Sequence, residues 1–243
     1  MPRVEIKEIE HMKLKNPIIV EGFPGIGMIG TICASYLADK LQMKLVGYLA
    51  SNLFPPIAAI HDYKPVSPAR IYASEKHNLI VIYSEFVIPA QIVYPLAQEI
   101  IAWAKKHDAA AIYSLAGIMS PQPENEKVYG IASTPKMADK LRKANIELIR
   151  EGATQGVSGV LVAEAAAQEF PAGNLMIQTS QPLDPRGSAR LLNTFKEIID
   201  IKLDTEPLVN EAAKVETRMN EALQKLQSMH KGYEELEQKR AYG

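Results

Sequence analysis

The chain has 243 residues, of which 47% are hydrophobic and 23% are charged, and these ordinary proportions exclude a largely disordered or collagen-like protein. Its 27 basic and 28 acidic residues give a formal net charge of -1, so we expect neither nucleic acid nor a membrane surface as a partner. The single cysteine, Cys33, excludes an intramolecular disulfide and a multi-cysteine metal site. The sequence shows no signal-peptide core and no apolar run of about 18 residues, so we expect a soluble cytoplasmic protein.

Short β-rich runs alternate with helix-like segments from residue 1 to about residue 205. In chain order, the expected elements are strands at 4–9 and 18–21, a helix at 29–41, strands at 44–49, 70–73 and 79–86, a helix at 90–107, strands at 110–115 and 127–131, helices at 135–144 and 160–170, a strand at 175–180 and a helix at 185–201. Several strands, such as 79–83, are apolar on both faces, which is typical of strands that helices cover on both sides. We therefore expect an α/β core domain over residues 1–206, a three-layer sandwich with a mixed, mostly parallel sheet.

Three of the expected helices have readable starts. Thr134 and Asp184 each offer a side-chain cap directly before a proline, and Pro89 opens the helix at 90–107. These residues predict where the first turn of each helix lies, without information from the rest of the chain.

Residues 207–243 have a different pattern, because 12 of the last 36 residues are charged and the apolar ones alternate four and three apart. This spacing is the 3.5-residue seam of a coiled coil. The seam consists of Leu208, Ala212, Val215, Met219, Ala222, Leu226, Met229, Tyr233 and Leu236. We expect a long C-terminal helix that mediates homo-oligomerisation, with a tetramer or a pentamer as candidates. A surface helix that lies on its own domain is the alternative.

A glycine-rich segment at residues 21–30 directly follows an expected strand and opens a helix. Gly25, Gly27 and Gly30 match the G-x-G-x-x-G spacing of loops that hold a pyrophosphate at a helix N-terminus. The acidic residue that would bind a ribose about 20 residues later is missing from 44–50. A tight turn with close packing of helix on sheet explains these glycines better, and nucleotide or phosphate binding stays as an alternative.

Other candidate residues do not assemble into a catalytic or metal site. Ser158 lies in a G-x-S-G sequence, which differs from the G-x-S-x-G nucleophile elbow. The five histidines are scattered, without a pair at metal-ligand spacing. Cys33 and Trp103 fall in apolar helical stretches and are expected in the core. We expect no catalytic residues, no metal and no cofactor.

Three glycine-containing motifs follow one another along the chain, at residues 21–30, 156–161 and 183–189. With them, residues 15 to 205 resemble the proteasome assembly chaperone family in its archaeal branch. The resemblance implies a phosphorylase/hydrolase-like α/β sandwich without an established catalytic set. It also implies a role on the α subunits of the 20S proteasome, either in assembly or as an activator.

The last three residues, Ala241, Tyr242 and Gly243, resemble the hydrophobic-tyrosine-any-residue ending of proteasome activators. The resemblance implies that this tail docks between α subunits, and Ala241 departs from it as a weak hydrophobic residue. Two hypotheses of other classes stay open. The first is an enzyme that binds a nucleotide or phosphate at 25–30, and the second is a scaffold subunit that recruits a related family member through the heptad helix.

Overall fold

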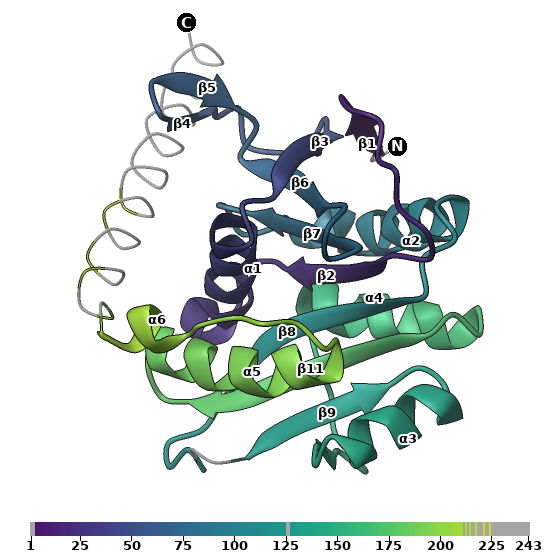
Figure 1. Ribbon diagram of the computed structural model, residues 1–243, viewed down its shortest axis with the longest axis vertical. Coiled ribbons are helices and arrows are strands. Elements are labelled where there is room, and N and C mark those ends of the chain that lie inside the picture. Colours follow the sequence, from purple (N-terminus) through teal and green to yellow (C-terminus); the bar gives the residue numbers. More distant parts are fainter. Residues whose placement is uncertain are drawn as a thin grey trace, which may run out of the picture.

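The computed structural model describes residues 3–124 and 127–210, together with residues 212, 214, 217, 221 and 224 (Figure 1). Its strands are β1 (Val4–Glu8), β2 (Ile18–Gly22), β3 (Lys44–Ser51), β4 (Ala59–His61), β5 (Lys64–Val66), β6 (Ala69–Ser74), β7 (Leu79–Ser84), β8 (Ala111–Met119), β9 (Val128–Ala132), β10 (Glu147–Leu148) and β11 (Ala172–Thr179). Its helices are the short 3-10 turn η1 (Ile26–Met28), then α1 (Ile29–Lys40), α2 (Ala90–Lys106), α3 (Pro135–Lys143), α4 (Gly156–Ala167), α5 (Pro185–Ile198) and α6 (Glu206–Asn210).

Nine strands form one sheet in the order β1-β3-β6-β7-β2-β8-β11-β9-β10, so that β1 and β10 are its edges. The centre, β7-β2-β8-β11, is parallel, and β9 with β10 is parallel as well. The pairs β1-β3, β3-β6, β6-β7 and β9-β11 are antiparallel. The sheet is mixed, as expected, although parallel pairs make up half of its pairs and not most of them.

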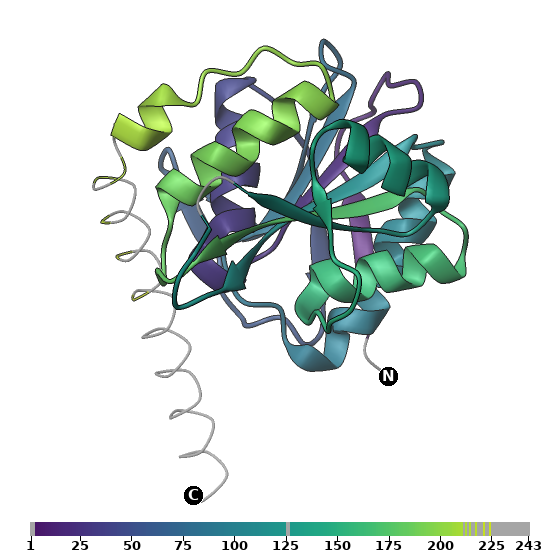
Figure 2. The same cartoon turned by 90° about the horizontal axis from the view of Figure 1, so that it is seen from below.

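Helices cover both faces of this sheet, which confirms the three-layer α/β sandwich. On one face α2 and α4 pack side by side over the core cluster that contains Ile19 and Ile112. On the other face α1, α3 and α5 cover the cluster that contains Val20 and Tyr113. Figure 2 shows α5 and α4 on opposite sides of the sheet. Neighbouring residues of β2 and β8 point to opposite faces of the sheet, and each strand contributes apolar residues to both clusters. Both faces of these central strands are therefore apolar, as expected for buried parallel strands.

The three helix starts that the sequence indicates are confirmed: α2 begins directly after Pro89, without a side-chain cap, and the other two helices have capping hydrogen bonds. The Thr134 hydroxyl accepts a hydrogen bond from the amide of Met137, at 3.2 Å. A carboxylate oxygen of Asp184 accepts one from the amide of Gly187, at 2.7 Å. Such caps satisfy amide groups that the first turn of a helix would leave without a partner.

Two features of the fold differ from the expected elements. Helix α4 begins at Gly156, four residues before the expected start, and incorporates Gly159, which packs closely on Thr154. The hairpin of β4 and β5 was not expected, and it projects from the main sheet (Figure 1). Its turn residues Asp62 and Tyr63 have φ values of 48° and 63°, the left-handed conformation that a tight hairpin turn needs.

Candidate functional site

The glycine-rich loop lies at the carboxyl end of β2, next to the centre of the parallel sheet. Residues 23–28 lead from β2 through η1 into α1. Gly27 has a φ of 65°, and its carbonyl oxygen accepts a hydrogen bond from the amide of Asp184, at 2.9 Å. A left-handed backbone at this position favours glycine. The loop is thus tied to the turn that follows β11, at the edge where α/β proteins commonly bind ligands.

Close backbone packing, however, accounts for several glycines at this loop. A Cβ atom at Gly22 would collide with the carbonyl oxygen of Gly30, and one at Gly30 with the carbonyl oxygen of Leu115 in β8. A Cβ atom at Gly117 would collide with the carbonyl oxygen of Ile26. A Cβ atom at Gly25, by contrast, would meet nothing within 4 Å. The approach of α1 and η1 to β2 and β8 therefore explains Gly30 and the neighbouring Gly22 and Gly117, whereas no packing contact explains Gly25.

A row of buried polar side chains crosses the parallel strands below this loop. Glu21, Ser114 and Asn174 occupy paired positions on β2, β8 and β11, and all three are at most 1% exposed. The Glu21 carboxyl accepts hydrogen bonds from the amide of Phe23, at 2.9 Å, and from the hydroxyl of Ser158, at 3.3 Å. Neither side-chain polar atom of Asn174 has a partner among the described residues. Burial raises the pKa of Glu21, although these hydrogen bonds act in the opposite direction. Burial of Glu21 thus disfavours its charged form.

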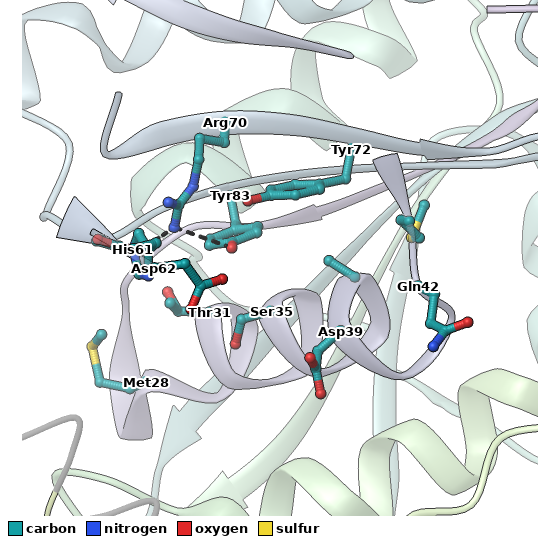
Figure 3. Close-up of a pocket in the computed structure, with 13 residues that line it drawn as sticks. Met28, Thr31, Ser35, Asp39, Gln42, His61, Asp62, Arg70, Tyr72 and Tyr83 are labelled. Atoms are coloured by element: carbon teal, nitrogen blue, oxygen red, sulfur yellow. Dashed lines mark hydrogen bonds and ion pairs between the residues drawn. The ribbon is translucent and has the colours of Figure 1, made fainter. Parts of the chain in front are cut away.

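An open cavity of about 620 Å³ lies between α1 and the strands β6 and β7 (Figure 3). Residues from α1 form one wall, residues from β6 and β7 form the other, and the β4–β5 hairpin closes one end. It is lined by Met28, Thr31, Ser35, Ala38, Asp39, Gln42, Met43, His61, Asp62, Arg70, Tyr72, Tyr83 and Glu85. None of these residues was singled out from the sequence, because they come from separate segments between residues 28 and 85.

Arg70 is the central charged group of this cavity, and its side chain is only 3% exposed. Its guanidinium forms an ion pair with Glu85, and Nη2 donates a hydrogen bond to the hydroxyl of Tyr83, at 3.2 Å. His61 Nε2 lies 2.7 Å from the same Glu85 oxygen. Burial alone would lower the pKa of Arg70, but Tyr83, Glu85 and Tyr72 outweigh it and raise that pKa. Arg70 thus stays charged inside the protein.

Two tyrosine rings extend from Arg70 along the cavity. The rings of Tyr72 and Tyr83 are almost parallel, at 8°, with centroids 5.7 Å apart. The guanidinium carbon of Arg70 lies 5.9 Å and 5.3 Å from the two centroids, which is a cation–π distance. Burial raises the pKa of Tyr83, so its hydroxyl remains a hydrogen-bond donor.

Residues that the sequence analysis assigned to the core lie there. Cys33 is fully buried, its thiol donates to the carbonyl oxygen of Ser188, and burial raises its pKa. Trp103 is 5% exposed, and its indole donates to Glu8, at 3.0 Å. Ser158 contacts a carboxyl and not a histidine, and among the described residues no group of three or more His, Cys, Asp or Glu could hold a metal ion.

The structure describes the C-terminal segment only in part. Leu208 and Ala212, the first two positions of the heptad seam, are 2% and 7% exposed, and Leu208 belongs to the core cluster beneath α1 and α5. The predicted seam positions Val215, Met219, Ala222, Leu226, Met229, Tyr233 and Leu236 lie outside the described residues, as do Ala241, Tyr242 and Gly243. Within the part of the chain that is described, no helix is long and apolar enough to cross a bilayer.

Comparison with known proteins places the chain among archaeal relatives. The sequence model of the PAC2 family matches residues 19–223. An uncharacterized protein of Methanocaldococcus jannaschii is 31% identical over 95% of this chain and 96% of its own length. The crystal structure of Pyrococcus furiosus PbaA, an archaeal homologue of proteasome-assembly chaperone, superposes with a TM-score of 0.80 at 29% identity, covering 97% of this chain and 100% of PbaA.

Pyrococcus furiosus PbaB, an archaeal proteasome activator, has the same fold, with a TM-score of 0.75 at 20% identity over 90% of this chain and 98% of PbaB. The expected resemblance to proteasome assembly chaperones is thereby confirmed. The chain belongs to the PAC2 family.

Proposed function

We propose that this chain is a proteasome assembly chaperone or activator that acts by binding and not by catalysis. The observation that carries the proposal is its similarity to PbaA, an archaeal homologue of proteasome-assembly chaperone, along nearly the whole of both chains. The close packing at Gly22, Gly30 and Gly117 supports the proposal as well, because it accounts for these glycines without a bound phosphate.

In this proposal the core domain, residues 1–206, carries a C-terminal heptad helix and docking tail, residues 207–243. Ala241, Tyr242 and Gly243 bind the α-ring of the 20S proteasome. A terminal carboxylate can pair with a lysine, and a tyrosine ring supplies rigid amphipathic contact area. The protein acts in the cytoplasm, where its partner would be found.

The seam would join several copies of the chain, so that several tails reach one ring and bind more tightly together than singly. Because Leu208 and Ala212 are buried within the same chain, the part of the seam that can join copies would begin at Val215. A homotetramer or a homopentamer is the proposed assembly. A related family member that replaces some copies would give the same presentation of tails.

A pull-down with purified archaeal 20S particles tests the tail mechanism. We expect wild-type protein to be retained, and both a chain without Ala241–Gly243 and Tyr242→Ala to lose at least about tenfold in affinity, since a buried aromatic anchor contributes more than about 1.4 kcal/mol. Ala241→Leu should bind more tightly, because leucine restores a stronger hydrophobic contact.

Gln238→Ala is the matched control, since it alters the same segment without touching the last three residues. If the 20S particles retained all variants equally, the tail mechanism would be wrong. Peptide hydrolysis by the 20S particle, measured with and without the protein, then separates an activator, which raises the rate, from an assembly factor, which leaves it unchanged.

A further inference from the structure

We propose that the cavity between α1 and the strands β6 and β7 binds an organic cation with two or more amine or guanidinium groups, most simply a linear oligoamine such as a triamine. The site goes beyond the proposed proteasome role, because it lies in the core domain and uses no residue of the tail. Its volume, about 620 Å³, is in the usual range for small-molecule sites, roughly 300–1,000 Å³.

The charge of the lining residues favours a cation. Among the described residues, Arg70 is the only Arg or Lys that lines the cavity, and Glu85 already pairs with it. The two other carboxylates, Asp39 and Asp62, form no ion pair with any described residue. Arg70, Glu85, Asp39 and Asp62 together carry two net negative charges, which two ammonium groups of a ligand would neutralise.

The aromatic floor favours the same ligand. Tyr72 and Tyr83 lie parallel beside the cavity, and the π faces of tyrosine rings attract cations (Figure 3). Arg70 already lies within cation–π distance of both rings, so this pair accommodates a guanidinium in the resting protein. The remaining lining is suited to an alkyl chain, because Met28, Ala38 and Met43 are apolar.

The positions of the two carboxylates indicate the length of the ligand. Figure 3 shows Asp62 close to Thr31, near the start of α1, and Asp39 farther along the same helix. Thr31 and Asp39 are eight residues apart, about 12 Å at 1.5 Å per residue. An extended triamine can place one ammonium group near each carboxylate, with its alkyl segments passing the tyrosines and the hydroxyls of Thr31 and Ser35.

Titration calorimetry of the full chain with spermidine tests this site. We expect saturable one-to-one binding that weakens as salt is added, and a loss of about two- to fivefold for Asp62→Asn and for Asp39→Asn, since each removes one ion pair of an exposed carboxylate. Tyr72→Leu should weaken binding by a smaller factor, because it removes a π face but keeps an apolar wall.

Asp108→Asn is the matched control: Asp108 is an exposed aspartate outside the cavity, with a φ of 50° that asparagine also tolerates. Circular dichroism and thermal unfolding show that each variant is folded. Absence of binding at millimolar spermidine and at millimolar lysine peptide would overturn the proposal, and so would equal affinities for the two cavity variants and the control.

A second titration, with the tetrapeptide Lys-Ala-Ala-Lys, separates the two sources of such a cation. Binding of spermidine alone assigns the cavity to a free oligoamine, and binding of the peptide alone assigns it to basic side chains of a protein partner. A chain without residues 241–243 should bind either ligand as wild type does. Failure of the cation site is therefore distinguishable from failure of the tail mechanism.

Discussion

The two sides of α1 differ in how closely they are packed. On one flank Gly22, Gly30 and Gly117 let the helix and its leading turn approach β2 and β8 until backbone meets backbone. On the other flank Ser35 and Asp39 face an open cavity. The comparison teaches that a glycine within a ligand-loop spacing can be required by packing, as Gly30 is, whereas the open site beside it carries no sequence motif.

Substitution of Gly30 by valine should have the largest effect, because it tests the packed flank. The new side chain would overlap the carbonyl oxygen of Leu115, a backbone atom in the central strand β8 that cannot move aside. We expect a loss of about 3 kcal/mol or more in the free energy of unfolding, or failure to fold. Urea unfolding and soluble yield measure it.

Gly25→Ala is the control for that substitution. Its Cβ would meet no atom within 4 Å, and its φ of -160° is extended backbone that alanine adopts. We expect a change within about 0.5 kcal/mol. If both variants lost equal stability, close packing would not explain the motif.

Glu21→Gln should change how stability depends on pH, and this tests the polar row beneath the packed flank. The folded-state pKa of Glu21 is raised by burial above its value in the unfolded chain, so the folded state holds a proton that the unfolded state releases. The wild type should lose stability as pH rises above the unfolded pKa, by up to about 1.4 kcal/mol per pH unit until the folded pKa is passed.

Glutamine keeps the shape and cannot ionise, so the variant should lack this loss. Urea unfolding from pH 4 to pH 9 gives both curves. Parallel curves over that range would show that folding does not raise the pKa of Glu21.

Ser35→Ala should have the smallest effect, because it lies on the open flank. The Ser35 hydroxyl donates to the carbonyl oxygen of Ile32, at 3.2 Å, within the same helix. Alanine loses that bond but gains helix propensity, and the cavity leaves its neighbours in place. We expect the free energy of unfolding to change by less than about 0.5 kcal/mol. A loss above about 2 kcal/mol would mean that the open flank is packed as tightly as the other.

Most of the fold could be predicted because its elements carry local signals. Thr134 and Asp184 predict helix starts because their side chains cap the first turn. The run at 79–83 predicts a buried strand because it is apolar on both faces. The β4–β5 hairpin was not predicted, because its turn, Asp62-Tyr63, lacks the usual glycine or asparagine pair and Pro65 interrupts the second strand. The first turn of helix α4 was not predicted, because Gly156 and Gly159 are weak helix formers.

The cavity could not be predicted, since no local pattern joins its walls. Arg70 meets Glu85 only because β6 and β7 pair with Ala69 opposite Ser84, and both meet α1 only through the order of strands in the sheet. The one available signal was Arg70 itself, a charged residue inside an otherwise apolar stretch, Ala-Arg-Ile-Tyr-Ala. Such a charge needs a partner, and so marks a site before the structure is known.

The edges of the sheet have a consequence for how copies of this chain can associate. A long, flat, apolar edge strand invites strands of other molecules and leads to aggregation. Here β1 carries Glu5, Lys7 and Glu8 among its five residues, and β10 is only two residues long. Neither edge is a template for adding further strands. An ordered oligomer of this protein would therefore assemble through helices and loops, and concentrated solutions should resist the growth of intermolecular β-structure.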